Sequence, residues 1–454
     1  MKKILSIVLI GILVLSGLGA GASYVQKSSL KQSVIFDEYD MVIIAPNKFS
    51  GNIQPLIDHK NSVGIQTFLK TTEDIYDEFE GRDKAEQIKY FIKDAIENNH
   101  ISFVLLIGGR KSQLFQWHVP VRYVLLDDGF QHPTYISDLY FADIYKNVDE
   151  FEDWDSNGDD IFAEWGEDVL DLEPDIYIGR LPCRNRFEVK FVVDKIISYE
   201  TTAYDESWFD TAVFVGGDTF TDFEGNEGEM TCDVAASYLD DFTINRLYAS
   251  LGTISNPDDF VDAINDGCGF LMTRCRGGTD RIRLPFSDGS EMIYINNRNV
   301  PKLKNGDKYP IMVLSECWHA KFDVTVLNIF DYLRNVTDVY QSDCVYESIA
   351  WRLARKINGG AIAVLTQTHT CYGTFGDANE NNITDDAEML GGFLAVEVFR
   401  LYADEGRQIL GEIHGEVARN YVANFPVNRN LYDCKSVQEW ILIGDPSLKV
   451  GGYE

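Results

Sequence analysis

The stretch that most constrains the fold runs from Tyr309 to Asp323 and reads Tyr-Pro-Ile-Met-Val-Leu-Ser-Glu-Cys-Trp-His-Ala-Lys-Phe-Asp. Its short apolar run, Ile311 to Leu314, follows a proline and is typical of a buried parallel strand. Cys317 comes directly after this strand, at the edge of an open α/β sheet where ligands and catalytic groups gather. A thiol there can act as a nucleophile once its pKa is lowered. The alternative is a buried cysteine that packs as a small apolar side chain.

Short apolar segments and amphipathic segments alternate along the rest of the chain. The helix predicted at 85–98, for example, has Ile88, Phe91, Ile92 and Ile96 on one face. Such alternation is what a mainly parallel sheet with right-handed crossovers requires. The predicted strands lie at 39–46, 67–70, 103–109, 175–181, 211–218, 243–248, 269–274, 311–315 and 360–369.

Length and composition bound the domain organisation. With 454 residues, 45% of them hydrophobic, the chain is globular in composition but too long for one typical domain of ~100 to 200 residues. We therefore predict an α/β fold of two lobes, at 36–205 and at 206–454, each with a mainly parallel sheet flanked by helices.

The net charge of −32 argues against nucleic acid as a partner. The eight cysteines include no C-x-x-C pair, which argues against a zinc knuckle or a thioredoxin-like site.

Residues 1–22 have the layout of a secretory signal peptide. Two lysines precede an apolar run from Ile4 to Leu18, and Ala20-Gly21-Ala22 offers a small-residue cleavage site. We therefore expect a mature protein that is secreted or held at the cell surface. The alternative is an uncleaved membrane anchor, because 4–22 is close to the ~20 residues that a membrane-spanning helix needs. Contact with a membrane is expected only in that case.

Two acidic loops have the ligand spacing of a calcium site. The first, Asp153-Trp-Asp-Ser-Asn-Gly-Asp-Asp-Ile-Phe-Ala-Glu, has a glycine where the loop must bend tightly, and its predicted ligands are Asp153, Asp155, Asn157 and Glu164. The second has Asn382 in place of that glycine, which tolerates the left-handed conformation, and its predicted ligands are Asp377, Asn379, Asn381, Asp385 and Glu388. We predict structural calcium and no organic cofactor. The alternative for each loop is a solvated acidic turn.

Several segments, taken in order, resemble one known family. They are Asp175-Ile-Tyr-Ile-Gly-Arg-Leu-Pro-Cys-Arg, Val193-Asp-Lys-Ile-Ile-Ser-Tyr-Glu, Phe214-Val-Gly-Gly-Asp-Thr-Phe, Cys317-Trp-His-Ala-Lys-Phe-Asp and Ile443-Gly-Asp-Pro-Ser-Leu-Lys-Val. Over Tyr39 to Tyr453 the chain is similar to the gingipain-type cysteine peptidases, family C25. The resemblance implies a caspase-like, gingipain-like α/β fold, a polypeptide substrate or ligand, and a Cys/His dyad in which Cys317 is the cysteine.

The chain departs from this family at the histidine. The family has it in a Gly-His-Gly turn after the strand that precedes the cysteine strand, and here that place reads Thr273-Arg-Cys-Arg-Gly-Gly, with Arg276 at the histidine position. A guanidinium can stabilise a thiolate, but with a pKa above ~12 it cannot transfer a proton at neutral pH. By its position, Asp175 corresponds to the acid that orients the histidine. The oxyanion donors implied are the Cys317 N–H and a glycine of the Gly277-Gly278 turn.

Two histidines offer an alternative base. His369 ends a predicted neighbouring strand and therefore belongs to the same sheet edge as Cys317. His319 is only two residues after Cys317, a spacing at which side chains on a helix do not face each other. The other interpretation of His369 is a histidine on the rim of the site with no catalytic role.

Together these features predict a secreted, calcium-supported, gingipain-like cysteine peptidase domain. Its hydrolysis of peptide bonds by the Cys317 thiolate is expected to be weakened or lost, because Arg276 cannot replace the base. One alternative is a non-enzymatic extracellular module that keeps the peptide-binding groove. Another is a calcium-binding structural module. A reactive Cys317 separates the peptidase from both, and peptide binding without cleavage separates the two modules.

Overall fold

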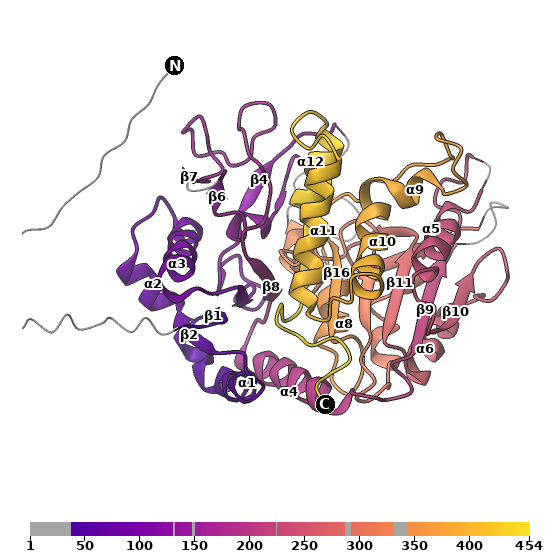
Figure 1. The fold of residues 1–454 in the computed structure, drawn as a ribbon, viewed down its shortest axis with the longest axis horizontal. Helices are drawn as coiled ribbons and strands as arrows, with labels where there is room; N and C mark the ends of the chain where they lie inside the picture. Colours follow the sequence, from indigo (N-terminus) through magenta and orange to yellow (C-terminus); the bar gives the residue numbers. More distant parts are fainter. Residues whose placement is uncertain (1–37, 130–131, 148–149, 224, 287–291, 331–343) are drawn as a thin grey trace, which may run out of the picture. The chain divides into compact units, whose positions relative to one another are not determined.

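One continuous ten-stranded sheet runs through the protein, in the order β10-β9-β11-β15-β16-β17-β8-β3-β1-β2 (Figure 1). The structure is a computed structural model that describes residues 38–129, 132–147, 150–223, 225–286, 292–330 and 344–454. The strands of the large sheet are β1 (Met41–Ala45), β2 (Thr67–Thr71), β3 (Phe103–Ile107), β8 (Tyr177–Leu181), β9 (Thr211–Gly216), β10 (Thr243–Tyr248), β11 (Phe270–Arg274), β15 (Ile311–Leu314), β16 (Ala363–Gln367) and β17 (Trp440–Ile443). Six of them, β1, β3, β11, β15, β16 and β17, are buried along their whole length. This burial explains their continuous apolar runs, because both faces of the sheet are covered.

The sheet reverses direction once, at β17. Strands β10, β9, β11, β15 and β16 are mutually parallel, and so are β8, β3, β1 and β2. The last strand, β17, is antiparallel to β16 but parallel to β8. The carboxyl ends of the strands in the two halves therefore lie at opposite edges of the sheet. The prediction of an α/β fold with mainly parallel strands is confirmed, and strands of both predicted lobes join in one sheet.

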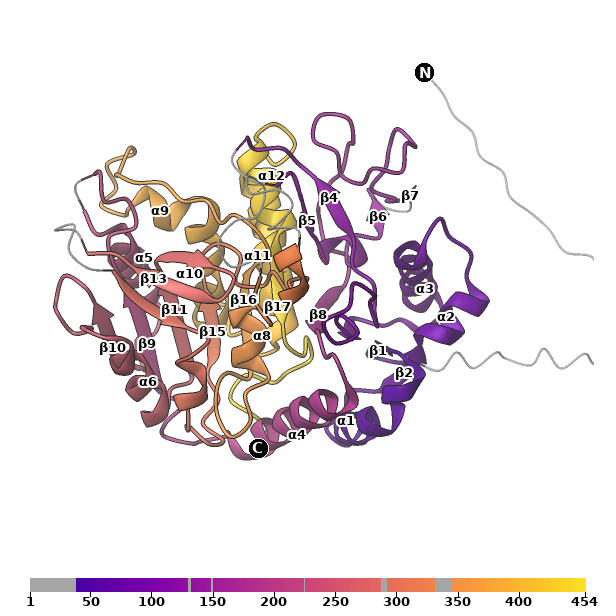
Figure 2. The same ribbon diagram turned by 180° about the vertical axis from the view of Figure 1, so that it is seen from behind.

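Helices flank the sheet on both faces. Asn185 begins α4 by accepting the N–H groups of Phe187 and Glu188, and Asn256 with Asp259 forms a capping box at the start of α6. Figure 1 shows α5, α10 and α11 over one face of the C-terminal half, and Figure 2 shows α8 on the other face. The helices are α1 (Ser50–Ser62), α2 (Thr72–Glu78), α3 (Lys84–Asn99), α4 (Arg186–Thr202), α5 (Glu227–Ala236), α6 (Pro257–Asp266), α8 (Ile349–Ala354), α9 (Asp385–Glu388), α10 (Leu390–Ala403), α11 (Leu410–Asn424) and α12 (Leu431–Gln438), with 3₁₀ turns at Asn47–Phe49, Leu139–Phe141, Val300–Lys302 and Val326–Asn328.

Small sheets lie outside the large one. The chain leaves the large sheet after β11, forms the antiparallel strands β12 (Arg276–Gly278), β13 (Arg281–Leu284) and β14 (Ile293–Asn296), and returns before β15. Two short pairs, β4 (Tyr123–Leu125) with β5 (Thr134–Ile136) and β6 (Tyr145–Lys146) with β7 (Glu150–Phe151), belong to the N-terminal half. The β12–β14 sheet was not predicted, and it supplies one wall of the site described below.

The predicted signal peptide at 1–22 lies outside the described residues. Within the residues that the structure does describe, none of the helices combines the length and the apolar character that a membrane span requires.

Candidate active site at Cys317

Cys317 lies in a tight turn directly after β15. As predicted, β15 is the neighbour of β11, and it pairs with β16 on its other side, so the turn follows an interior strand of the C-terminal half of the sheet. The Trp318 N–H donates to the carbonyl oxygen of His369 at 2.7 Å, which ties the turn to the end of β16. Trp318 has a φ of +63°, a conformation that bulky residues rarely adopt. The surrounding contacts therefore hold a strained turn that carries the thiol.

Gly277 in β12 packs directly against this turn. A Cβ atom at Gly277 would stand 2.4 Å from the Cys317 carbonyl oxygen and 2.6 Å from the Cys317 nitrogen, so no other residue type fits without movement. Gly278, the next residue, pairs with Arg281 across the small sheet. The structure thus brings the predicted glycine turn to Cys317.

The Cys317 thiol is half-buried, and its environment keeps it protonated. Burial, together with the charge of Glu439, raises its pKa to about 11. The guanidinium groups of Arg283 and Arg274 oppose this rise, as does a hydrogen bond of 3.5 Å from the thiol to the carbonyl oxygen of Cys371. A thiol with such a pKa is a thiolate in only about one molecule in ten thousand at pH 7. Nucleophilic chemistry at Cys317 therefore needs a base.

Arg276 precedes Gly277 in β12, but its side chain binds elsewhere. Its Nε donates to the carbonyl oxygen of Thr219 at 2.9 Å, in the segment that follows β9. The cations whose charges act on the thiol are Arg283 and Arg274. Arg283 stands opposite Arg276 in the β12–β13 register and donates to the carbonyl oxygen of Gly277. The sequence prediction missed Arg283, because nothing in it indicated the hairpin that folds β13 back over the site.

A buried arginine, Arg274, links four segments around the site and acts electrostatically on the thiol. Arg274, at the end of β11, is 2% exposed and donates through Nε to Asp386 of α9 at 2.8 Å. Its Nη1 donates to the Ser315 carbonyl oxygen at 2.9 Å and lies 3.4 Å from the Cys371 sulfur. Arg274 was not among the predicted site residues, and its partners lie far away along the chain.

Among the described residues, neither candidate histidine forms a hydrogen bond with the Cys317 thiol. His369 is buried, its Nδ1 lies 3.2 Å from the Thr370 hydroxyl, and burial together with Lys435 lowers its pKa to about 2. His319 is fully buried, with Nε2 at 3.1 Å from the Arg281 carbonyl oxygen and Nδ1 at 3.2 Å from the Glu316 carboxylate. Each imidazole thus has partners other than Cys317.

Asp175 is placed just before β8. Its carboxylate accepts the N–H groups of Ile144 at 2.6 Å and of Tyr145 at 2.8 Å. In the described part of the chain no hydrogen bond or ion pair joins Asp175 to Cys317, Arg276 or His369. The structure therefore gives Asp175 a backbone-binding position.

Glu439 is a further acid near the thiol that the sequence prediction did not include. It precedes β17, is 1% exposed, and neither of its carboxyl oxygens has a hydrogen-bond partner among the described residues. Burial raises the pKa of Glu439 well above its usual range, and its charge acts on both Cys317 and Cys371.

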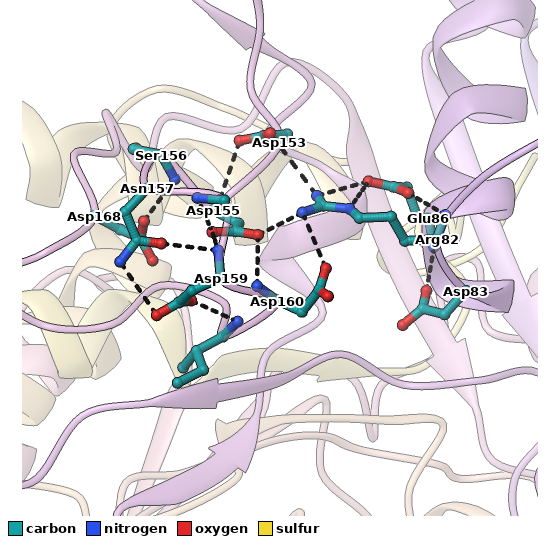
Figure 3. Close-up of polar contacts among 12 residues, drawn as sticks. Arg82, Asp83, Glu86, Asp153, Asp155, Ser156, Asn157, Asp159, Asp160 and Asp168 are labelled. Carbon is teal, nitrogen blue, oxygen red and sulfur yellow. Dashed lines mark hydrogen bonds and ion pairs between the residues drawn. The ribbon is translucent and has the colours of Figure 1, made fainter.

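The first acidic loop holds an arginine among its carboxylates (Figure 3). The Arg82 guanidinium contacts Asp155 directly and lies 3.8 Å from Asp153 and 3.7 Å from Asp160. Asp155 also accepts the backbone N–H groups of residues 158, 159 and 160. The side chain of the predicted ligand Asn157 contacts Asp159 within the loop, and Glu164 donates its backbone N–H to Asp168. Calcium in this loop would have to displace the guanidinium, and it stays a prediction.

The second acidic loop folds back on itself. Asp377 accepts the N–H groups of Asn381 and Asn382, and Asp385 accepts that of Ala378. The Glu388 carboxylate returns over the start of the loop, at 2.9 Å from the Asn379 amide and 2.7 Å from the Asn381 amide. Across the described ranges no group of three or more His, Cys, Asp or Glu side chains has the arrangement of a metal site. Any cation here would rely on the asparagine oxygens as well.

These observations define the class of protein: an α/β fold of the caspase-like type with a cysteine at the carboxyl edge of a central strand. The family model described as "Peptidase family C25" matches residues 36–451, and the chain therefore belongs to peptidase family C25.

Relatives and solved structures agree with this family. Gingipain R2 of Porphyromonas gingivalis strain W83 is 23% identical over 425 residues, which are 90% of this chain and 46% of that protein. Gingipain R1 of Porphyromonas gingivalis is 24% identical over 234 residues, which are 50% of this chain and 19% of that protein. The chain thus spans less than half the length of these relatives. The crystal structure of the Arg-specific cysteine proteinase gingipain R superposes with a TM-score of 0.62 at 19% identity, over 91% of this chain and 78% of that one, which shows a shared fold.

Proposed function

We propose that the chain is an extracellular C25 domain that binds polypeptide at the Cys317 site and hydrolyses it weakly or not at all. One observation carries the proposal. Within the described ranges, which contain all seven histidines, no imidazole forms a hydrogen bond with the Cys317 thiol. A cysteine peptidase needs a base to form the thiolate and an acid to protonate the leaving amine. The signal-peptide pattern at 1–22 supports the extracellular location.

The residues around Cys317 are better suited to binding than to proton transfer. Gly277 has no side chain to block a peptide backbone, and Arg283 brings a positive charge that stabilises any thiolate that forms. An arginine keeps its proton at neutral pH, so neither Arg283 nor Arg276 can act as the base. Loss of the base from a nucleophile and base that act together removes most of the rate.

The proposal is tested by restoring the base. Arg276→His introduces an imidazole at the family's histidine position, and Arg276→Gln removes the same charge without supplying a base. We expect hydrolysis of a fluorogenic peptide library to rise in Arg276→His and to stay at the unmodified level in Arg276→Gln. Adding Cys317→Ala to the Arg276→His chain should abolish the gain. Peptide binding is measured separately, by fluorescence polarisation on Cys317→Ala.

Other results would overturn the proposal in distinct ways. If the unmodified chain cleaves peptides readily and His369→Ala abolishes cleavage, a relocated dyad operates. If no library peptide is cleaved by any variant or bound by Cys317→Ala, the chain is a structural module.

We further propose that the loop at 377–388 binds calcium. The convergence of Asp377, Asn379, Asn381 and Glu388 at the spacing of a calcium loop supports this. Bound calcium would hold α9 in place, and Asp386 of α9 accepts a hydrogen bond from Arg274 of the Cys317 site. Its role would be structural, with no part in the chemical step.

A further inference from the structure

A cavity of about 620 Å³ opens at the edge of the sheet opposite to Cys317. Its walls come from the segments that follow three strands of the N-terminal half: Pro46 and Lys48 after β1, Thr72 and Glu73 after β2, and Lys111 with 116–118 after β3. Because this half of the sheet runs opposite to the half that carries Cys317, the cavity and the thiol are separate sites. The volume is in the usual range of small-molecule sites.

The topology explains why a cavity forms here. Strand β1 pairs with β2 on one side and with β3 on the other. The chain that leaves β1 runs to one side, to β2, whereas the chain that leaves β3 runs to the other side, to β8. Such a switch point leaves a crevice outside the carboxyl ends of the strands, and ligands of open α/β sheets bind in that crevice.

The charge of the cavity is opposite to that of the chain. Lys48, Lys84 and Lys111 line it, against the single carboxylate of Glu73, although the net charge of the protein is −32. Within the described residues these three lysines form no ion pair, whereas many other lysines of the chain do. Lys84 lies over the ring of Tyr76 at 4.8 Å. Unpaired cations gathered in one concave site favour an anionic ligand.

Lys48 and His118 are polar residues of the cavity lining that contact each other. The Lys48 ammonium lies 3.3 Å from His118 Nε2, which is also 3.1 Å from the Arg184 carbonyl oxygen. His118 is 5% exposed, and its Nδ1 has no hydrogen-bond partner among the described residues. Burial and the charge of Lys111 lower the pKa of Lys48. An anion between Lys48 and Lys111 would relieve the repulsion between them.

The aromatic residues of the cavity lining indicate that the ligand has an apolar group in addition to its charged group. Tyr76 and Trp117 contribute aromatic surface against which a ring or an apolar group can pack. We propose that this cavity binds a small organic dianion, a phosphate ester or a dicarboxylate, with its charged group on Lys48 and Lys111 and its apolar part against the two aromatic side chains. Lysine ammonium groups bind phosphate and carboxylate as point charges, without the bidentate geometry of arginine.

Isothermal titration calorimetry on the full chain tests this proposal, with inorganic phosphate, phenyl phosphate and succinate as probes at matched ionic strength. We expect saturable binding of phenyl phosphate, tighter than that of inorganic phosphate because of the aromatic wall; succinate tests whether a dicarboxylate is accepted as well. Lys48→Gln and Lys111→Gln should each weaken the binding of phenyl phosphate about tenfold, the usual worth of one charge-assisted contact. Lys48→Arg, which keeps the charge, should retain more of the affinity than Lys48→Gln.

The matched control is Lys190→Gln. Lys190 is an exposed lysine paired with Asp194, so its loss changes the net charge equally without touching the cavity. Melting temperatures of all variants check that each chain is folded. Equal affinity in all variants would overturn the proposal, as would the lack of saturable binding by any probe. Binding of polyglutamate without binding of the small probes would assign the cavity to an acidic polypeptide instead.

Discussion

Gly277 lies so close to Cys317 that a methyl group on Gly277 would stand 2.4 Å from the Cys317 carbonyl oxygen. The contact joins the small β12–β14 sheet to the turn after β15, and it sets the position of the thiol relative to the wall of the site. The position of Cys317 therefore depends on a residue with no side chain of its own.

Gly277→Ala should destabilise the protein by about 1 to 3 kcal/mol, the usual cost of forcing an extra carbon into a packed site. Denaturant unfolding measures this change. Gly51→Ala is the control, because a Cβ atom at Gly51 in α1 meets nothing within 4 Å and alanine is the better helix former. Equal stability of Gly277→Ala and the unmodified chain would contradict the close contact.

Alkylation of Cys317 should be slow at neutral pH and should accelerate as the pH rises towards its pKa of about 11. Only the thiolate reacts, so the rate should increase about tenfold per pH unit between pH 7 and pH 10. Peptide mapping after treatment with iodoacetamide follows this rate for each cysteine. In the unfolded chain the same residue should level off above pH ~9, because an unperturbed cysteine has a pKa of ~8.5. A rate that is already maximal at pH 7 would show a lowered pKa and contradict the burial argument.

Asp386→Ala should cost about 3 to 5 kcal/mol of unfolding free energy, because it leaves the buried Arg274 guanidinium without its anionic partner. The same change should disturb the Cys317 site, since Arg274 also holds Ser315 and contacts Cys371. Asp258→Ala removes an exposed partner of Lys302 and should cost less than ~1 kcal/mol. Similar losses of unfolding free energy in the two variants would contradict a stabilising role for the buried Arg274–Asp386 ion pair.

Calcium should raise the melting temperature of the chain, and a chelator should lower it, because a ligand that binds only the folded state stabilises it. Glu388→Gln should abolish most of this response. Glu164→Gln in the first loop should leave it intact, since Arg82 already supplies a cation among the carboxylates there. Identical melting temperatures in calcium and in chelator, for protein purified without metal, would show that both loops are solvated turns that do not bind calcium.

Much of the fold could be predicted from the sequence. Continuous apolar runs such as Phe103–Ile107 and Ile311–Leu314 indicate buried strands, because a strand that is covered on both faces buries the side chains of both faces. The ordered motifs between Asp175 and Val450, with Cys317 among them, were enough to indicate the family. In addition, the predicted adjacency of β11 and β15 brought the glycine turn to Cys317.

Only the tertiary structure decided what surrounds the thiol. Arg274, Arg283 and Glu439 reach Cys317 from β11, from an unpredicted hairpin and from the segment before β17, and local sequence carries no record of such distant contacts. The antiparallel insertion of β17 also sends the carboxyl ends of β1, β2 and β3 to the opposite edge from Cys317. The sequence by itself therefore indicated nine of the ten strands of the large sheet, all except β17, and which cysteine follows β15. The pairing of distant segments decided the pKa of the thiol, because burial and charge depend on what packs around it.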